Sequence, residues 1–377
     1  MAPGAVREPL GLYIHVPFCL SKCPYCDFYS LSRHDDELLD IYAAAICRSL
    51  NEWAERLNMP ADTLYFGGGT PSLLEGRRLT EIIERAAIGF GLAGAEITLE
   101  ANPGDDLEET FRLFSQAGGN RVSLGMQSAD AGELRRLGRR HTPEDTRRAV
   151  EAVHKAGMDN VSLDMMLALP SQTQEHISLS AAVCRELGAR HVSAYLLKLE
   201  ENTPFYAARG RLRLPDEEET AAMYLHACEQ LEYRGYRQYE ISNFAQPGFE
   251  SRHNRKYWLS APYLGLGPSA HSYVGGKRFY YPRDLKGFLA GGEPLDEDGE
   301  DSQIPDGSPE EYLMLRLRLT EGVREEEYRQ RFGGPLPEQW RIRALALPRE
   351  LVICDEEGIR LTRQGFLLSN EVLARLL

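Results

Sequence analysis

The stretch of sequence that decides the fold is residues 15–30, HVPFCLSKCPYCDFYS. Three of the seven cysteines of the chain lie in it, at Cys19, Cys23 and Cys26, with the spacing C-x3-C-x2-C. The apolar and aromatic run GLYIHV leads into it and predicts a buried strand. Three thiolates on a short loop directly after a strand are suited to an iron–sulfur cluster. The other four cysteines are dispersed along the chain and are expected to be packing residues.

The number of clustered cysteines has a chemical consequence. A [4Fe–4S] cube needs one ligand for each iron, so three cysteines leave one iron open to a donor from outside the protein. A structural zinc site is the alternative, and it would need a fourth protein ligand such as His15. A disulfide is less suited to a cytosolic chain. The spacing alone leaves the cluster and the zinc site open as alternatives.

Outward from this motif, short β-rich runs alternate with stretches of helical periodicity. The runs are GLYIHV, TLYFGG, EITLEA, RVSLGM, NVSLDMML and HVSAYLL. Six successive strand-then-helix units predict parallel strands covered by helices, either as a partial barrel or as a doubly wound sheet. Polar residues follow so many of these strands that the barrel is favoured. We therefore predict an α/β fold with a partial, TIM-like (β/α)6 barrel.

The alternation of strands and helices, and the point at which it ends, predict three regions of the chain. Residues 1–235 form the barrel. Residues 236–308 form an extension rich in glycine and aromatic residues, which contains the string HNRKYW and ends in an acidic, turn-rich linker over residues 291–309. Residues 309–377 contain helical runs, two short strand-like runs and a final helical run, RQGFLLSNEVLARLL. This order predicts a small α+β domain of winged-helix type.

Composition restricts the partners and the location of the chain. Its 377 residues carry 43 Lys and Arg against 57 Asp and Glu, a formal net charge of −14. A balance this acidic disfavours a nucleic-acid partner, because it supplies no broad surface that neutralises phosphates. No apolar run approaches the roughly 20 residues of a membrane helix, and residues 1–10 lack the apolar core of a secretory signal. We therefore expect a cytoplasmic protein.

Candidate binding residues follow the second to fifth strands. The turn GGGTP at residues 67–71 brings backbone amides close to a bound group, and Thr70 before Pro71 is expected to cap a helix. Carboxylates suit amine and ribose hydroxyl groups, and a guanidinium suits a carboxylate. The polar residues at or soon after the ends of strands three to five are Glu100, Gln127, Arg139 and Asp164.

The cysteine motif after strand one and the glycine turn after strand two resemble the radical S-adenosylmethionine (SAM) superfamily. The resemblance implies a [4Fe–4S] cluster on the three clustered cysteines, with SAM on the open iron, where an electron from the cluster generates a 5′-deoxyadenosyl radical. The chain is similar in particular to the branch of the oxygen-independent coproporphyrinogen III oxidases. The positions that match the SAM contacts of that branch are Tyr13, Gly68, Gly69, Thr70, Glu100, Gln127, Arg139 and Asp164.

A narrower resemblance rests on HNRKYW at residues 253–258 and YLGLGPSAHS at 263–272. Together with the cysteine motif, these strings are similar to the heme chaperones of the same branch, over essentially the whole chain. The resemblance implies heme bound near His253, Asn254, Tyr257 and Trp258. Considered without it, His253 and His271 are expected to be hydrogen-bonded histidines of an aromatic core.

The resemblance predicts a heme chaperone that transfers heme to acceptor hemoproteins, respiratory ones among them. The alternative is a coproporphyrinogen III oxidase, which carries a fourth cysteine where this chain has Phe28 and a longer N-terminal extension. These two departures disfavour decarboxylation, and no residue is assigned a catalytic role. A tRNA-modifying radical enzyme and a zinc-stabilised binding protein are further alternatives. The sequence leaves open whether SAM is cleaved, whether the protein associates peripherally with membranes, and its oligomeric state.

Overall fold

The computed structural model describes residues 8–297 and 304–377. Its centre is a run of six parallel strands in sequence order, in agreement with the six predicted strand runs. These strands are β1 (Leu10–Val16), β2 (Ala61–Gly68), β3 (Glu96–Ala101), β4 (Arg121–Gln127), β5 (Asn160–Leu167) and β6 (His191–Leu196). All seven residues of β4 are buried. Strands buried on both faces tend to be largely apolar, as several of these are, which helps the sequence to identify them.

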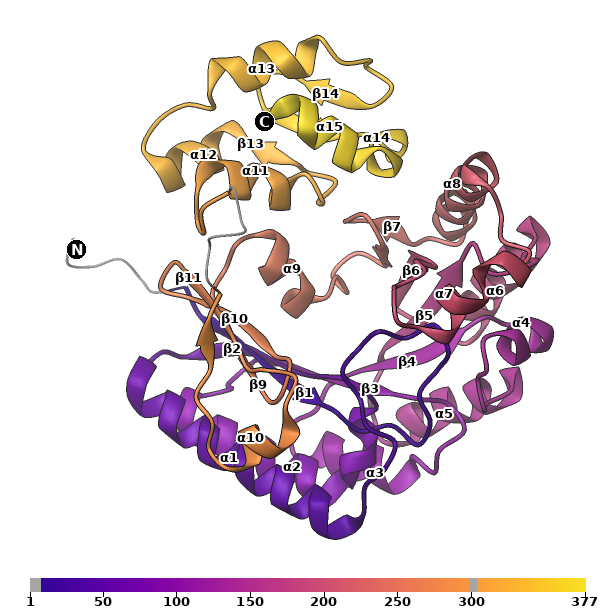
Figure 1. Ribbon diagram of the computed structural model, residues 1–377, viewed down its shortest axis with the longest axis vertical. Coiled ribbons are helices and arrows are strands. Elements are labelled where there is room, and N and C mark those ends of the chain that lie inside the picture. Colours follow the sequence, from indigo (N-terminus) through magenta and orange to yellow (C-terminus); the bar gives the residue numbers. More distant parts are fainter. Residues whose placement is uncertain (1–7, 298–303) are drawn as a thin grey trace.

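Helices connect the strands and cover the outer face of the sheet, where Figure 1 shows α1, α2 and α3. The helices that follow the six strands are α1 (Asp36–Leu57), α2 (Glu75–Phe90), α3 (Glu108–Gln116), α4 (Ala131–Arg136), α5 (Pro143–Lys155), α6 (Gln174–Glu186), α7 (Pro204–Ala208) and α8 (Glu217–Tyr233). The first helix begins where the Asp35 carboxylate accepts a hydrogen bond from the Leu38 amide, and it ends at Asn58 with φ of 47°. Such caps satisfy backbone groups that the helix leaves free. No helix within the described ranges is long and apolar enough to span a membrane.

Short strands beyond residue 236 extend both edges of the same sheet. At the β6 edge lie β8 (Asn243–Ala245), antiparallel to β6, and then β7 (Arg237–Gln238). At the other edge β9 (Tyr263–Leu266) pairs in parallel with β1 and leads to β10 (His271–Val274), β11 (Lys277–Tyr280) and β12 (Leu295–Asp296). Helix α10 (Leu285–Leu289) lies between β11 and β12 in sequence. The predicted acidic linker falls partly on residues 298–303, outside the described residues.

Helix α9 (Arg252–Trp258) contains the HNRKYW string and covers the end of the sheet at which the strands begin. The Lys256 ammonium donates to the carbonyl of Pro9, just before β1, at 2.8 Å, and lies 2.8 Å from the carboxylate of Asp62 in β2. The backbone amide of His253 donates to Glu96, the first residue of β3, at 3.0 Å. Because these partners stand at the starts of three neighbouring strands, α9 closes the barrel opposite the cysteine loop.

The C-terminal part is a small α+β unit that lies beyond α9 in Figure 1. Its elements are α11 (Pro309–Arg316), β13 (Val323–Arg324), α12 (Glu325–Phe332), α13 (Glu338–Leu345), β14 (Val352–Cys354), β15 (Gly358–Leu361), α14 (Arg363–Leu367) and α15 (Ser369–Leu376). The strands form an antiparallel sheet in the order β13-β15-β14. The final helical run is divided at Leu368, whose ψ of 22° interrupts the helix.

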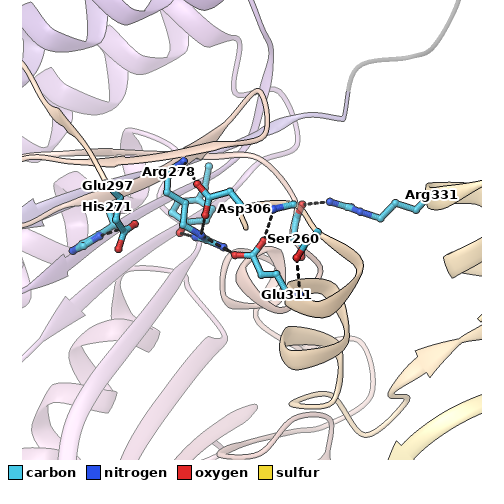
Figure 2. Close-up of polar contacts among 10 residues, drawn as sticks. Ser260, His271, Arg278, Glu297, Asp306, Glu311 and Arg331 are labelled. Atoms are coloured by element: carbon cyan, nitrogen blue, oxygen red, sulfur yellow. Dashed lines mark hydrogen bonds and ion pairs between the residues drawn. The ribbon is translucent and has the colours of Figure 1, made fainter. Parts of the chain in front are cut away.

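Polar contacts attach this unit to the edge of the large sheet (Figure 2). The Arg278 guanidinium of β11 donates to Glu311 at 2.9 and 2.7 Å and lies 3.4 Å from Asp306. Arg331 donates to the carbonyl of Ser260 at 3.3 Å. Arg278 and Glu311 are largely buried, so this is a charge-assisted contact shielded from water rather than an exposed ion pair.

The expectation for His271 is wrong. Its side chain is exposed and lies 4.0 Å from the Glu297 carboxylate, with its ring stacked on Tyr280. The residue stands in β10, and successive side chains of a strand point to opposite faces, so an aromatic neighbourhood in sequence does not bury every position.

Candidate functional site

A cavity of about 640 Å³ lies at the end of the barrel where the parallel strands finish. This is the end at which parallel α/β folds place their binding residues. The predicted residues that line it are Cys19, Cys23, Cys26, Gly68, Gly69, Thr70, Glu100, Gln127, Arg139, Asp164 and Asn254. Tyr13, His253, Tyr257 and Trp258 are absent from its lining. The structure therefore brings together most of the predicted SAM residues and one of the predicted heme residues.

The cysteine loop, residues 17–31, leaves β1 and returns beside its own start. The amide of Cys19 donates to the carbonyl of Leu31 at 3.0 Å, and the amide of Leu31 donates to the carbonyl of Pro17 at 2.7 Å. These two hydrogen bonds hold the loop so that its three cysteines face one end of the cavity. Burial raises the pKa of the Cys26 thiol; the Phe28 backbone lowers it, and the nearby sulfurs of Cys23 and Cys19 raise it.

The glycine turn after β2 packs directly on the backbone of the cysteine loop. The amide of Gly69 donates to the carbonyl of Val16 at 2.8 Å, and a Cβ added at Gly69 would lie 2.6 Å from the carbonyl oxygen of Phe18. Only glycine permits this approach. Thr70 precedes a short 3-10 helix, Pro71–Leu74, as expected, but its hydroxyl does not cap that helix. It donates instead to the Cys19 Sγ at 3.5 Å.

A chain of hydrogen bonds connects two of the cysteine sulfurs. Asn102 donates to the Thr70 hydroxyl at 2.8 Å, and its own side-chain oxygen accepts from the Arg139 guanidinium at 2.5 Å. Arg139 also donates to the carbonyl of Gly125 at 3.0 Å and to the Cys23 Sγ at 3.5 Å. The buried Nε of Arg139 has no partner. Because buried donors are normally satisfied, this N–H suits a carboxylate ligand.

Two partly buried carboxyl groups line the same cavity. Glu100 accepts from the Tyr65 hydroxyl at 2.6 Å, and Asp164 accepts from the Ser123 hydroxyl at 3.1 Å. Burial raises the pKa of Glu100 to about 7 and that of Asp164 to about 6. A cationic group bound between them would favour their ionised forms. This pair of carboxyls and the Arg139 guanidinium match the amine, hydroxyl and carboxylate groups of an amino-acid-bearing nucleoside such as SAM.

Gln127 occupies a constrained position at the end of β4. Its φ is +63°, and the pairing of β4 with β5 shifts register between Leu124 and Gln127. Its side-chain oxygen accepts a hydrogen bond from the Tyr195 hydroxyl at 3.0 Å. A non-glycine residue in this region of backbone space is a marker of functional sites. The irregularity turns the Gln127 side chain into the cavity.

Several cavity residues were not predicted from the sequence. They are Tyr65 in β2, Asn102 after β3, Tyr195 in β6 and Arg283 before α10. The rule that polar residues at strand ends gather at one edge of a parallel sheet already applies to Asn102, two residues after Glu100, and to Tyr195 at the end of the sixth run. Arg283 follows a strand that the alternation did not indicate, so no local signal identified it.

The heme candidates on α9 lie mostly beneath the cavity. Both ring nitrogens of His253 are engaged, with the Thr63 hydroxyl at 2.8 Å and the Tyr257 hydroxyl at 2.8 Å. The ring is stacked on Tyr65, with centroids 5.1 Å apart, and the residue is only 1% exposed. Burial lowers the pKa of His253 to about 3. In this arrangement the His253 imidazole is a neutral core group, as its residue type alone suggested, whereas Asn254 faces the cavity.

Tyr13 and His15 lie next to each other beside the site. The Nδ1 of His15 is 3.1 Å from the Tyr13 hydroxyl, and its Nε2 is 3.0 Å from the carbonyl of Tyr29. With both nitrogens in use, His15 is not presented as a fourth zinc ligand. Within the described residues, no three His, Cys, Asp or Glu side chains are grouped tightly enough for a single metal ion.

Comparisons with known proteins agree with this architecture. The profile of the Radical SAM superfamily matches residues 13–182, and the profile of the HemN C-terminal domain matches residues 305–368. A solved structure of coproporphyrinogen III oxidase (HemN) from Escherichia coli has a TM-score of 0.80 and 21% identity, covering 98% of this chain and 90% of that chain. The chain is therefore a radical SAM protein with the HemN fold, which confirms the fold prediction.

Relatives of the same length narrow the assignment. The heme chaperone HemW of Lactococcus lactis is 33% identical, covering 99% of this chain and 98% of that protein. HemW of Bacillus subtilis is 35% identical, covering 97% of this chain and 98% of that protein. The chain belongs to the family of the heme chaperone HemW, as the sequence motifs predicted. Membership of the radical SAM superfamily implies a [4Fe–4S] cluster and SAM.

Proposed function

We propose that this protein is a heme chaperone, which binds heme and transfers it to acceptor hemoproteins. The observation that carries the proposal is the similarity to HemW chaperones over nearly the whole of both chains. The cavity beside the cysteine loop agrees with it, because exposed residues such as Phe28 and Lys22 line its edge and leave it accessible to a large ligand.

Within this function, the cysteine loop holds a [4Fe–4S] cluster through Cys19, Cys23 and Cys26. We assign the SAM carboxylate to Arg139, whose buried Nε lacks a partner, and the amine and ribose hydroxyls to Glu100 and Asp164. The cluster and SAM supply one-electron chemistry when bound. The other predicted contacts that line the cavity are the backbone of the turn at residues 68–70 and the side chain of Gln127. Tyr13 does not line it, and its contact with SAM stays a prediction.

The alternative function is that of an oxygen-independent coproporphyrinogen III oxidase. The likeness to HemN in fold is compatible with it, but at 21% identity that likeness extends to the fold alone. Phe28 argues against it, since the oxidase branch has a cysteine at this position. The side chain of Phe28 is 64% exposed at the edge of the cavity and supplies no ligand.

One experiment separates the two functions. Protein reconstituted anaerobically with iron, sulfide and SAM is given heme in one arm and coproporphyrinogen III in the other. A chaperone gives stoichiometric heme binding in the Soret region and transfer to an apo-hemoprotein, with no protoporphyrinogen formed. Formation of protoporphyrinogen with turnover would establish the oxidase instead. Arg139→Met is expected to weaken SAM binding by about tenfold through loss of a charge-assisted contact, without affecting cluster iron.

We further propose a cytoplasmic location. We also propose that nucleic acid is not a partner, because the chain carries a net charge of −14. Respiratory hemoproteins are the first acceptors to test in the transfer assay, with and without membrane vesicles, so that a peripheral membrane association is detected in the same experiment. Sedimentation of the heme-free and heme-loaded protein gives the oligomeric state.

A further inference from the structure

A large aromatic side chain is exposed at the edge of the cavity. Phe28 is 64% exposed although it lines the cavity beside Cys26 and Asp27. The Lys22 ammonium donates to the carbonyl of Phe28 at 3.0 Å, which holds the backbone at this point. An exposed ring at the mouth of a pocket offers a flat apolar face to a ligand, and aromatic pairs gain energy beyond the area that they bury.

Basic side chains from three separate segments line the cavity near Asp27 and Phe28. Lys22 comes from the cysteine loop, Lys198 follows β6, and Arg283 precedes α10; all three line the cavity and are exposed. Together with Phe28 they form what we call the basic rim. The remaining cation of the cavity, Arg139, lies deeper and is bonded to Asn102 and Gly125.

The ion pairs of the basic rim are exposed to solvent. Arg283 lies 3.6 Å from the Asp27 carboxylate, with side chains 61% and 44% exposed. Lys198 lies 2.8 Å from Glu200 with its own side chain 80% exposed, and Asp27 also acts on it electrostatically. Exposed pairs of this kind contribute little to stability, so a ligand with carboxylates can replace Asp27 and Glu200 at low cost. In a chain with a net charge of −14, three cations around one exposed ring stand out as an anion site.

We propose that the basic rim binds the edge of a flat macrocycle that carries carboxylates, with Phe28 against the ring and with Arg283 and Lys198 on the carboxylates. This inference rests on the proposed function, because heme is a macrocycle with two propionates. It identifies the mouth of the cavity, above the cluster and SAM, as the heme site. The HNRKYW helix lies at the opposite end of the barrel, beneath the cavity.

The test compares heme with its dimethyl ester, which has the same ring but no carboxylates. Both are titrated, by the Soret band, into anaerobically reconstituted wild type and into the double variant Arg283→Ala with Lys198→Ala. The double variant is expected to bind heme roughly three- to tenfold more weakly, in the range from an exposed pair to a charge-assisted hydrogen bond. Its affinity for the ester should equal that of wild type. The matched control is Arg33→Ala with Lys286→Ala, two exposed cations outside the cavity lining.

Phe28 is tested separately. Phe28→Ala is expected to weaken heme and the ester alike, and Phe28→Trp to restore both, because the ring contact does not depend on charge. Equal heme affinity in wild type and in the double variant, or an unchanged affinity in Phe28→Ala, would overturn the basic rim while leaving heme binding intact. Wild type that binds neither heme nor the ester would overturn the proposed function itself. All variants lie on exposed positions, and iron content and thermal unfolding verify that they fold.

Discussion

The cysteine loop and helix α9 lie at opposite ends of the same sheet and use their polar groups differently. The sulfurs of Cys19 and Cys23 accept hydrogen bonds of 3.5 Å, an ordinary length for sulfur, from Thr70 and Arg139. On α9, the two ring nitrogens of His253 lie 2.8 Å from the Thr63 hydroxyl of β2 and 2.8 Å from the Tyr257 hydroxyl of the same helix. The Lys256 ammonium lies 2.8 Å from the Pro9 carbonyl and 2.8 Å from the Asp62 carboxylate. Hydrogen-bonding groups that are unused at the cysteine loop are available to ligands, whereas the polar groups of α9 are bonded within the protein and stabilise the fold.

The largest effect is expected at the cysteine loop. Changing Cys19, Cys23 and Cys26 together to alanine should reduce iron and acid-labile sulfide to background after anaerobic reconstitution, because thiolates are the ligands of the cluster. The measurement is elemental analysis together with the brown absorbance of the cluster. Cys354→Ala, a half-buried cysteine of β14, is the control and should retain both. Stoichiometric zinc without iron in the wild type would contradict the cluster.

A smaller effect is expected at α9. His253→Phe keeps an aromatic ring but leaves the hydroxyls of Thr63 and Tyr257 without their partner. Two buried hydrogen bonds lost in this way should lower the free energy of unfolding by about 2–4 kcal/mol. Denaturant unfolding measures this loss. Cluster iron and the Soret band of bound heme should stay as in wild type.

Tyr257→Phe is the matched control for that variant, because it removes one of the same two hydrogen bonds. Its expected cost is about 1 kcal/mol. If His253→Phe shifted the Soret band while Tyr257→Phe did not, then His253 would be an axial heme ligand, and α9 would have a binding role in addition to its structural one.

The smallest effect concerns pH at the open end. Since the pKa of Glu100 is raised from 4.5 to about 7, its ionisation opposes folding of the ligand-free protein, whose stability should decline as the pH rises from about 4.5 to about 7 and level off above that. A bound cation favours the ionised form of Glu100. The affinity for SAM should therefore rise between pH 5.5 and 7.5, by at most about tenfold per pH unit for each coupled proton. Isothermal titration at several pH values measures this slope.

Glu100→Gln is the test of that slope, because the amide keeps the size of the side chain but carries no charge. The variant should bind SAM more weakly at pH 7.5, with a flatter pH dependence. A slope identical to that of wild type would mean that Glu100 does not face the charged part of SAM. Asp164→Asn then tests the neighbouring carboxyl, whose pKa of about 6 predicts a midpoint at lower pH.

The parts of the fold that were predicted have strong local signals. The six parallel strands are β-rich runs at regular spacing, several of them largely apolar. The cysteines, the glycine turn and the polar residues at strand ends can be recognised from their positions relative to these strands. The pairing of β9 with β1 was not predictable in this way. YLGL is only four residues long, and its partner strand lies some 250 residues earlier in the chain. The sequence pattern contains no direct signal for such a long-range pairing.

Within the site, the sequence did not predict the direction in which each side chain points. His253 and Asn254 are neighbours on one helical turn, yet only Asn254 lines the cavity. The string HNRKYW does not indicate which face of the helix is directed toward the cavity. The direction of the Thr70 side chain was also not predictable. A threonine at this point of the glycine turn can either cap the following helix or donate to a sulfur, and Thr70 donates to the sulfur.

The path of the chain through α9 has a mechanical consequence. Strand β8 pairs with β6 at one flank of the barrel, and β9 pairs with β1 at the other, so the segment between them crosses from flank to flank. Its bonds to Pro9 and Glu96 fix the length of that crossing. The helix thus holds the starts of β1 and β3 to a segment that runs from one flank of the sheet to the other, although most of its residues lie outside the cavity wall.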